Sequence, residues 1–166
     1  QLLAGPISDA LGRRKPLIAG MLLYTVGAVA SALAPDVYFF IGVRTVMAVG
    51  AAAVLVVAAA IIRDFASGSE MLLLYSKVFW IQGFAPIVAP LFSSQFLTFS
   101  DWRTLFLVFA IFGAGSALFA GLKLPESLKL EDRRDQMFAG MGARFSHVLR
   151  DRVFVGLLVI SLMMQV

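Results

Sequence analysis

The chain of 166 residues is 60% hydrophobic and only 14% charged, and its formal net charge at pH 7 is +4. A soluble domain of this length cannot bury so much apolar surface in one core, so lipid must be the solvent for most of it. The absence of cysteine excludes thiol catalysis, disulfides and cysteine-ligated metals, and the single histidine, His147, cannot form a histidine metal site. The positive charge is too localised to indicate a nucleic-acid partner, and we expect neither a metal nor a cofactor.

A polar turn, residues 5–15, separates the first two apolar runs. Its sequence is G-P-x-x-D-x-x-G-R-R-K, in which we expect Gly5 and Gly12 to allow close packing and a tight reversal of the backbone. The turn carries one acid and a compact cationic patch: Asp9, Arg13, Arg14 and Lys15. An ordinary positively charged loop is the alternative interpretation.

Apolar runs long enough to cross a membrane follow one another along the chain. Residues 1–7 are expected to end one span, and complete spans are predicted at 16–34, 37–62, 71–97 and 104–122. Short turns at 35–36 and 98–103 and a polar loop at 63–70 connect these spans. A charged connector is predicted at 123–152, followed by the start of a further span at 153–166. Because the chain starts at Gln1 rather than Met and stops within an apolar run, we expect it to be a fragment of a longer protein.

The distribution of lysine and arginine predicts which connections lie in the cytoplasm. The segments 5–15, 63–70 and 123–152 hold three, one and seven of these residues, whereas the turn 98–103 holds only Arg103. This excess places the first set inside by the positive-inside rule. Within the connector, apolar residues around His147 recur at helical spacing, which favours an amphipathic helix on the inner membrane surface. We interpret His147 as an interfacial residue without a catalytic role.

Two of the predicted spans carry small residues four positions apart, a spacing that lets membrane helices approach one another closely. In the span 16–34 this pattern appears twice, and in the span 104–122 it appears once. The residues are Gly27 with Ser31, Ala28 with Ala32, and the series Gly113, Ala117 and Gly121.

Arg44 is the sharpest polar feature within the predicted spans. It lies about six residues, or about 9 Å, below the outer end of its span. An arginine inside a membrane helix costs roughly 2.5–3.5 kcal/mol on insertion scales, so we expect it to face a partner or a water-filled cavity. Its helical face is mostly small: Ala48, Ala51, Leu55 and Ala58. A carboxylate partner would have to come from outside this sequence, and snorkelling to the outer headgroups is the alternative.

The segment 82–90 carries two prolines in the middle of a predicted span. Pro86 and Pro90 each remove one main-chain hydrogen bond, so this helix is expected to bend or soften near mid-membrane. Gln82 and Gly83 add a polar, flexible surface that suits an interface between domains. A kink with a purely structural role is the alternative.

Four motifs in order carry a family resemblance: the polar turn, A-P-x-x-A-P at 85–90, W-R-x-x-F at 102–106 and L-P-E-S at 124–127. Together they resemble drug/proton antiporters of the bicyclomycin-resistance (Bcr/CflA) type, within the major facilitator superfamily. The resemblance implies an all-α membrane protein that runs from the end of helix 2 to the start of helix 7 of that fold. Residues 1–122 would then be part of the N-terminal six-helix half, 123–152 the cytoplasmic connector between domains, and 153–166 the start of the C-terminal half.

The resemblance also implies roles for the matching residues. The family's loop that holds the two halves together and gates the inner side corresponds to Gly5, Asp9, Gly12, Arg13 and Arg14. Arg44 matches a fourth-helix arginine associated with proton coupling. The antiporter motif, which shapes the fifth helix at the interface between the halves, corresponds to Gly83, Pro86 and Pro90. The candidate substrate contacts are Phe79, Trp80 and Gln82.

We therefore expect a secondary active transporter of the bacterial cytoplasmic membrane that exports small lipophilic drugs in exchange for protons. Its partners would be the drug, protons and membrane lipid. Uptake of a nutrient or metabolite on the same fold is the main alternative. A membrane enzyme would need a nucleophile–base pair or a metal cluster within the spans, and the sequence offers neither. A membrane scaffold without transport would leave Arg44 without a purpose.

Overall fold

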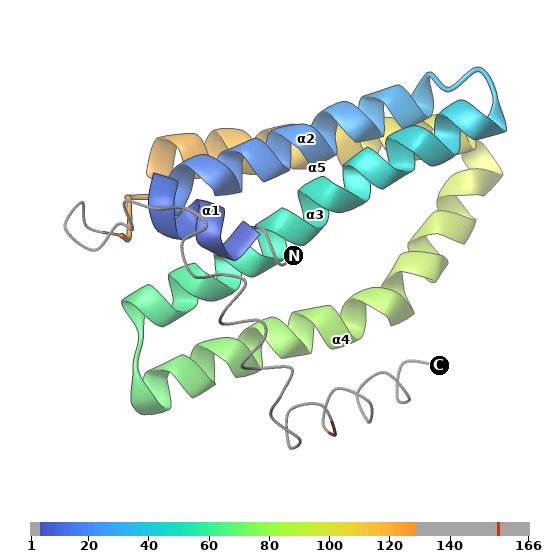
Figure 1. Cartoon of the computed structure of the whole chain (residues 1–166). Helices are drawn as coiled ribbons and strands as arrows, with labels where there is room; N and C mark the ends of the chain where they lie inside the picture. The colour runs from blue at the N-terminus through green and yellow to red at the C-terminus, as the bar shows by residue number, and fades with distance from the viewer. Residues whose placement is uncertain (1–3, 129–155, 157–166) are drawn as a thin grey trace. The chain divides into compact units, whose positions relative to one another are not determined.

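The computed structural model describes residues 4–128 and Gly156. The described part contains five helices and no strand: α1 (Ala4–Leu11), α2 (Arg14–Ala32), α3 (Val37–Phe65), α4 (Gly68–Phe99) and α5 (Trp102–Lys123) (Figure 1). Helices α2 to α5 are long and apolar enough to cross a membrane, which confirms the all-α membrane class and the four predicted complete spans. Most of the predicted connector, including the helix around His147, and all but one residue of the predicted further span lie outside the described residues.

Two connections are shorter than predicted. The inner loop predicted at 63–70 consists of only 66–67, because α3 and α4 continue into it. The outer turn predicted at 98–103 consists of only 100–101, where Asp101 accepts a hydrogen bond from the first backbone N–H of α5 and caps that helix. Charged and polar side chains at a helix end do not stop the helix, so composition alone made both loops too long.

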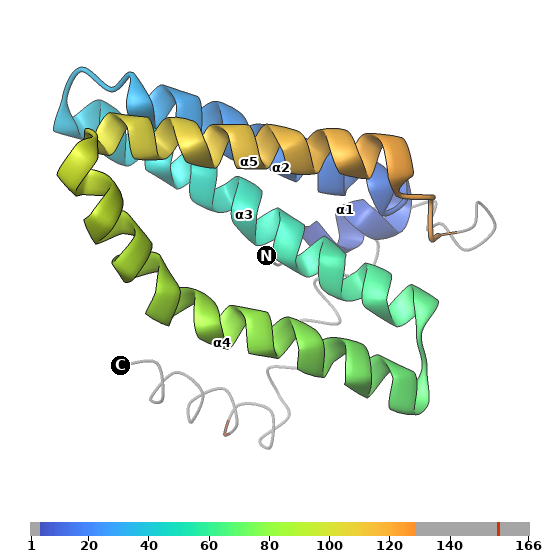
Figure 2. The ribbon, with the colours of Figure 1, turned by 180° about the vertical axis from the view of Figure 1, so that it is seen from behind.

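Helix α2 packs against α3 and against α5, and the two views show α2 and α5 side by side (Figures 1 and 2). The contact uses the predicted small residues of α2, all of which are buried: Gly27, Ala28, Ser31 and Ala32. On α5, Gly113 and Ala117 are buried as well. Gly121 differs from the prediction, because nothing lies within 4 Å of a Cβ built there. Small side chains bring the helix backbones close enough for direct packing.

Gly50 is the tightest point between α2 and α3. A Cβ built at Gly50 would lie 2.6 Å from the backbone nitrogen of Tyr24 and 2.7 Å from the carbonyl oxygen of Gly20. Backbone atoms cannot move aside as a flexible side chain can, so α2 and α3 would have to separate.

We expect Gly50→Ala to destabilise the full-length protein by about 1–3 kcal/mol, the usual cost of overpacking a close contact. Thermal unfolding in detergent measures this loss. The matched control is Gly42→Ala on the same helix, where nothing lies within 4 Å of the added Cβ. Equal melting temperatures for the two variants would contradict the packing described here.

Helix α4 differs from the other long helices. None of its residues is buried, and both views show its ribbon bending along its middle (Figures 1 and 2). Pro86 and Pro90 lie inside α4, which continues through both of them, so the predicted bend occurs without a break. Near the start of α4, the hydroxyl of Tyr75 donates to the carbonyl oxygen of Ala59 on α3 at 3.0 Å. This bond holds the beginning of α4 to α3.

Candidate functional site

The polar turn predicted at 5–15 is mostly helical, because α1 continues to Leu11 and α2 begins at Arg14. The chain reverses between the two helices, at Gly12. Gly12 is buried and has a φ of 87°, a left-handed conformation that side chains with a Cβ rarely adopt. The predicted reversal at Gly12 is therefore observed. Gly5 differs from the prediction, since no atom lies within 4 Å of a Cβ built there and close packing does not require a glycine.

Arg13 comes directly after Gly12 and makes two ion pairs. Its Nη1 lies 2.5 Å from Oδ1 of Asp9 on α1, and its Nε lies 3.0 Å from Oδ2 of Asp64 in the last turn of α3. Nη1 also donates to the hydroxyl of Ser8, which is fully buried, at 2.7 Å. Only 11% of the Arg13 side chain is exposed, so these bonds are better shielded from water than an ordinary surface ion pair.

The segment after α5 joins the same group. Oε1 of Glu126 accepts from the backbone N–H of Arg13 at 2.7 Å, and the hydroxyl of Ser127 donates to Oδ2 of Asp64 at 3.0 Å. We call this group the Arg13 cluster: Ser8, Asp9, Arg13, Asp64, Glu126 and Ser127. Beside it, the guanidinium of Arg14 donates to the carbonyl oxygen of Gly121 near the end of α5. The cluster thus links the ends of three helices and the segment after α5.

The two acids of the cluster favour the charged form of Arg13. Burial lowers the pKa of its guanidinium, but the hydrogen bonds and charges of Asp64 and Asp9 outweigh burial and raise that pKa above its ordinary value. A group whose pKa rises on folding contributes stability below its unfolded pKa and loses it only as the pH passes the folded value. For arginine both values lie far above neutral pH, so Arg13 contributes equally across the physiological range.

Sequence reasoning selected Asp9 and Arg13 but missed Asp64 as their partner. Asp64 was part of a predicted loop, and Glu126 and Ser127 were only part of a motif. The residues of the cluster are far apart in the chain, with separations of 51 positions for Arg13 and Asp64 and 113 for Arg13 and Glu126. One signal could have indicated this contact. Arg13 and Asp64 have opposite charges, and both lie at helix ends on the same predicted side of the membrane.

Arg44 lies about 30 Å from Asp64 along the axis of α3, at 1.5 Å per residue. Its guanidinium carbon lies 5.5 Å from the ring centroid of Phe106 on α5, and its Nη1 approaches Sδ of Met47 at 4.0 Å. The ion pairs found among the described residues all involve Arg13, so Arg44 has no carboxylate within 4.0 Å in this part of the chain. The two arginines therefore occupy separate places.

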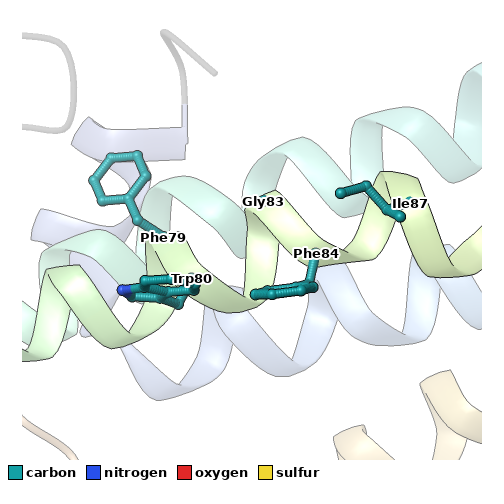
Figure 3. A pocket seen from close by; sticks show the side chains of 5 residues that line it. All are labelled: Phe79, Trp80, Gly83, Phe84 and Ile87. Atoms are coloured by element: carbon teal, nitrogen blue, oxygen red, sulfur yellow. The ribbon is translucent and has the colours of Figure 1, made fainter.

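The candidate substrate contacts lie on the exposed surface of α4. Phe79, Trp80 and Gly83 line a shallow hollow of about 410 Å³ together with Phe84 and Ile87 (Figure 3). The rings of Trp80 and Phe84 stack 5.6 Å apart at 20°, whereas Phe79 points to a different side of the helix in the same view. No charged residue lines this hollow, and its side chains are mostly aromatic. Gln82, Pro86 and Pro90 are exposed on the same helix outside the hollow.

Among residues 4–128, no group of three or more acidic or histidine side chains could hold a metal ion. The described candidate site residues offer charge pairing at the Arg13 cluster, a cation on an aromatic ring at Arg44 and apolar contact on α4.

Comparison with known proteins decides the family. Residues 1–166 match the family described as Major Facilitator Superfamily. The chain belongs to this superfamily. It is 35% identical over 158 residues to an uncharacterized MFS-type transporter, YdgK, of Bacillus subtilis, covering 94% of this chain and 39% of that protein.

Two further relatives are named for drugs. The chain is 29% identical over 157 residues to the multidrug transporter MdfA of Yersinia pestis, with 93% of this chain and 38% of the relative covered. It is 28% identical over 133 residues to a bicyclomycin resistance protein homolog of Haemophilus influenzae, with coverages of 80% and 33%. These names confirm the resemblance to drug transporters of the bicyclomycin-resistance type. The chain spans less than two fifths of the length of each of these three relatives.

Proposed function

We propose that the full-length protein exports small lipophilic drugs in exchange for protons across the bacterial cytoplasmic membrane. One observation carries the proposal: Arg44 stands in the outer part of an apolar helix and has no carboxylate in reach among the described residues. A charge in such a place marks an ion or proton pathway in membrane proteins. Two relatives are named for multidrug transport and bicyclomycin resistance, and these names and the apolar, aromatic hollow on α4 support a lipophilic substrate.

The proposed mechanism is alternating access between two six-helix halves. Residues 1–122 belong to the first half, 123–152 connect the halves, and 153–166 begin the second. An acid elsewhere in the full-length protein pairs with Arg44 when deprotonated and releases it when protonated, so that protonation biases the equilibrium between inward-open and outward-open states. The Arg13 cluster gates the inner side, and the bend at Pro86 and Pro90 shapes α4 where it meets the second half.

Everted membrane vesicles of cells that express the full-length protein test this function. Respiration acidifies the vesicle interior, and a pH-sensitive dye reports the gradient. Chloramphenicol and other lipophilic drugs should then collapse the gradient, because each drug molecule pumped inward brings protons out. Vesicles without the protein are the control.

Uptake of a nutrient or metabolite is the second candidate function, since the same fold serves both directions of transport. It predicts a different vesicle result. If folded protein gives no response to any drug but responds to a polar metabolite, drug export is wrong.

The two prolines of α4 provide a separate test of the mechanism. We expect the double change of Pro86→Ala and Pro90→Ala to straighten α4 and to slow drug-driven proton release at least several-fold, while the protein still inserts and remains helical. The vesicle assay measures the rate. Pro35→Ala, in the outer turn between α2 and α3, is the control for losing a proline elsewhere. Wild-type rates in the double variant would mean that the bend has no role in transport.

A further inference from the structure

The cation at Arg44 is held by side chains of two helices. Its guanidinium carbon lies 5.5 Å from the ring centroid of Phe106 on α5, within the distance at which an aromatic face attracts a cation. Met47, on α3 like Arg44, places its sulfur 4.0 Å from Nη1. In the described part of the chain, Arg44 thus rests on an aromatic ring and a thioether.

The ring of Phe106 has little freedom to move. Only 9% of this residue is exposed, and its ring makes edge-to-face contacts with three neighbours whose centroids lie 5.5–6.1 Å away: Phe40, Trp102 and Phe109. Such contacts fix the orientation of an aromatic ring. Phe106 therefore offers Arg44 a rigid surface.

Met47 is also fixed in place. It is 6% exposed, and it packs where α3 meets α2 so closely that a Cβ built at Gly27 would lie 2.8 Å from Cβ of Met47. The two groups that contact the guanidinium therefore belong to the same packed core, which holds α2, α3 and α5 together.

The charged and titratable groups near Arg44 are few in the described structure. On α2, Tyr24 packs against the core that contains Phe106 and Met47. On α5, Arg103 donates to the carbonyl oxygen of Ala34 and lies over the ring of Trp102. The carboxylates of Asp36 and Asp101 cap the starts of α3 and α5.

We propose that Phe106 is a positioning residue for proton coupling: its ring holds the Arg44 guanidinium while the coupling acid of the full-length protein is protonated. This inference rests on the proposed role of Arg44. The guanidinium alternates between the acid and the ring, so the ring stabilises the state in which the acid carries its proton. Without the ring, the released arginine is less stable and the acid binds a proton less readily. The pH dependence of transport then moves toward lower pH.

The first test uses Phe106→Leu in the full-length protein, with Phe109→Leu as the matched control. Both changes remove one ring from the same aromatic group, but within residues 4–128 it is the ring of Phe106, and not that of Phe109, that lies under the Arg44 guanidinium. We expect the pH profile of drug-driven proton release to move down by about half a unit in Phe106→Leu only, because a cation–π contact at an exposed site is weaker than the free energy of one pKa unit. Phe106→Tyr, which keeps the ring, should restore the wild-type profile. Equal profiles for the two leucine variants would overturn the proposal.

A second test measures the position of Arg44 directly, without measuring transport. It keeps an aromatic ring at Phe106, so it does not require the fold to tolerate leucine there. Incorporation of 3,4,5-trifluorophenylalanine in place of Phe106 keeps the shape of the ring but weakens its attraction for a cation. Phenylglyoxal labelling of Arg44, followed by mass spectrometry, should then be several-fold faster than in the wild type. Unchanged labelling would overturn the proposal. Faster labelling in a protein whose wild type shows no drug-driven proton release would support positioning by Phe106 and reject proton-coupled drug export instead.

Discussion

Arg44→Ala is expected to reduce drug-driven proton release by about 5- to 150-fold, the range of typical coupling free energies between two sites. The variant removes the one charged residue of α3 that lies away from the ends of this helix. In the proposed mechanism, the coupling acid then loses its partner. Arg44 is exposed in this structure, so its truncation opens no cavity in the packed core and the melting temperature should change little. The vesicle assay measures the loss of coupling, and thermal unfolding measures the fold.

Two companion variants sharpen this result. Arg44→Lys keeps the charge but loses the planar group that binds a carboxylate with two hydrogen bonds, so it should retain only part of the activity. Arg63→Ala removes an exposed cation from the last turn of the same helix and should leave coupling unchanged. Equal proton release in wild type and Arg44→Ala would remove Arg44 from the mechanism.

Arg13→Ala is expected to have the second large effect. It leaves Asp9 and Asp64 without the cation that they share and breaks the side-chain links between the turn and α3. Removing one partner of a fully buried ion pair costs about 3–5 kcal/mol of stability. An exposed ion pair contributes less than about 1 kcal/mol. Because this cluster is partly exposed, we expect a loss of about 1–3 kcal/mol in stability and a transport rate reduced by at least tenfold.

A double-mutant cycle isolates the contact between Arg13 and Asp64. Arg13→Ala combined with Asp64→Asn should destabilise the protein by less than the sum of the two single changes, with an interaction free energy of at least about 0.5 kcal/mol. The control cycle pairs Asp64→Asn with Lys15→Ala, because Lys15 is an exposed neighbour that makes no ion pair in the described structure. Additive effects in the Arg13 cycle would contradict the ion pair at 3.0 Å.

The elements of the fold could be predicted from the sequence because they depend on local properties. Apolar runs of membrane-crossing length become helices, and the Gly12 reversal and the bend at Pro86 and Pro90 follow from the backbone chemistry of single residues. The loop lengths could not be predicted in this way. They depend on capping bonds such as the one that Asp101 makes at the start of α5.

The contacts of the candidate site could not be read from the sequence, since they join distant parts of the chain. Arg13 contacts Asp64 and Glu126 only because α2 begins where α3 and α5 end. The aromatic ring that contacts the Arg44 guanidinium likewise belongs to Phe106, on another helix. In both cases the charged residue was recognised by its type, whereas its partner was determined by the packing of helices through small residues such as Gly27 and Gly50.

The most direct test of proton-coupled export is a drug gradient in liposomes that contain the purified full-length protein and an internal pH dye. Liposomes are loaded with chloramphenicol, which is neutral and carries no proton by itself, and are diluted into drug-free buffer with the membrane potential clamped. If drug and protons exchange, the interior acidifies as the drug leaves. Protein-free liposomes should then show no acidification, and liposomes with Arg44→Ala should acidify at least about fivefold more slowly than those with the wild type. Drug efflux through the wild-type protein without any change of internal pH would contradict proton-coupled export.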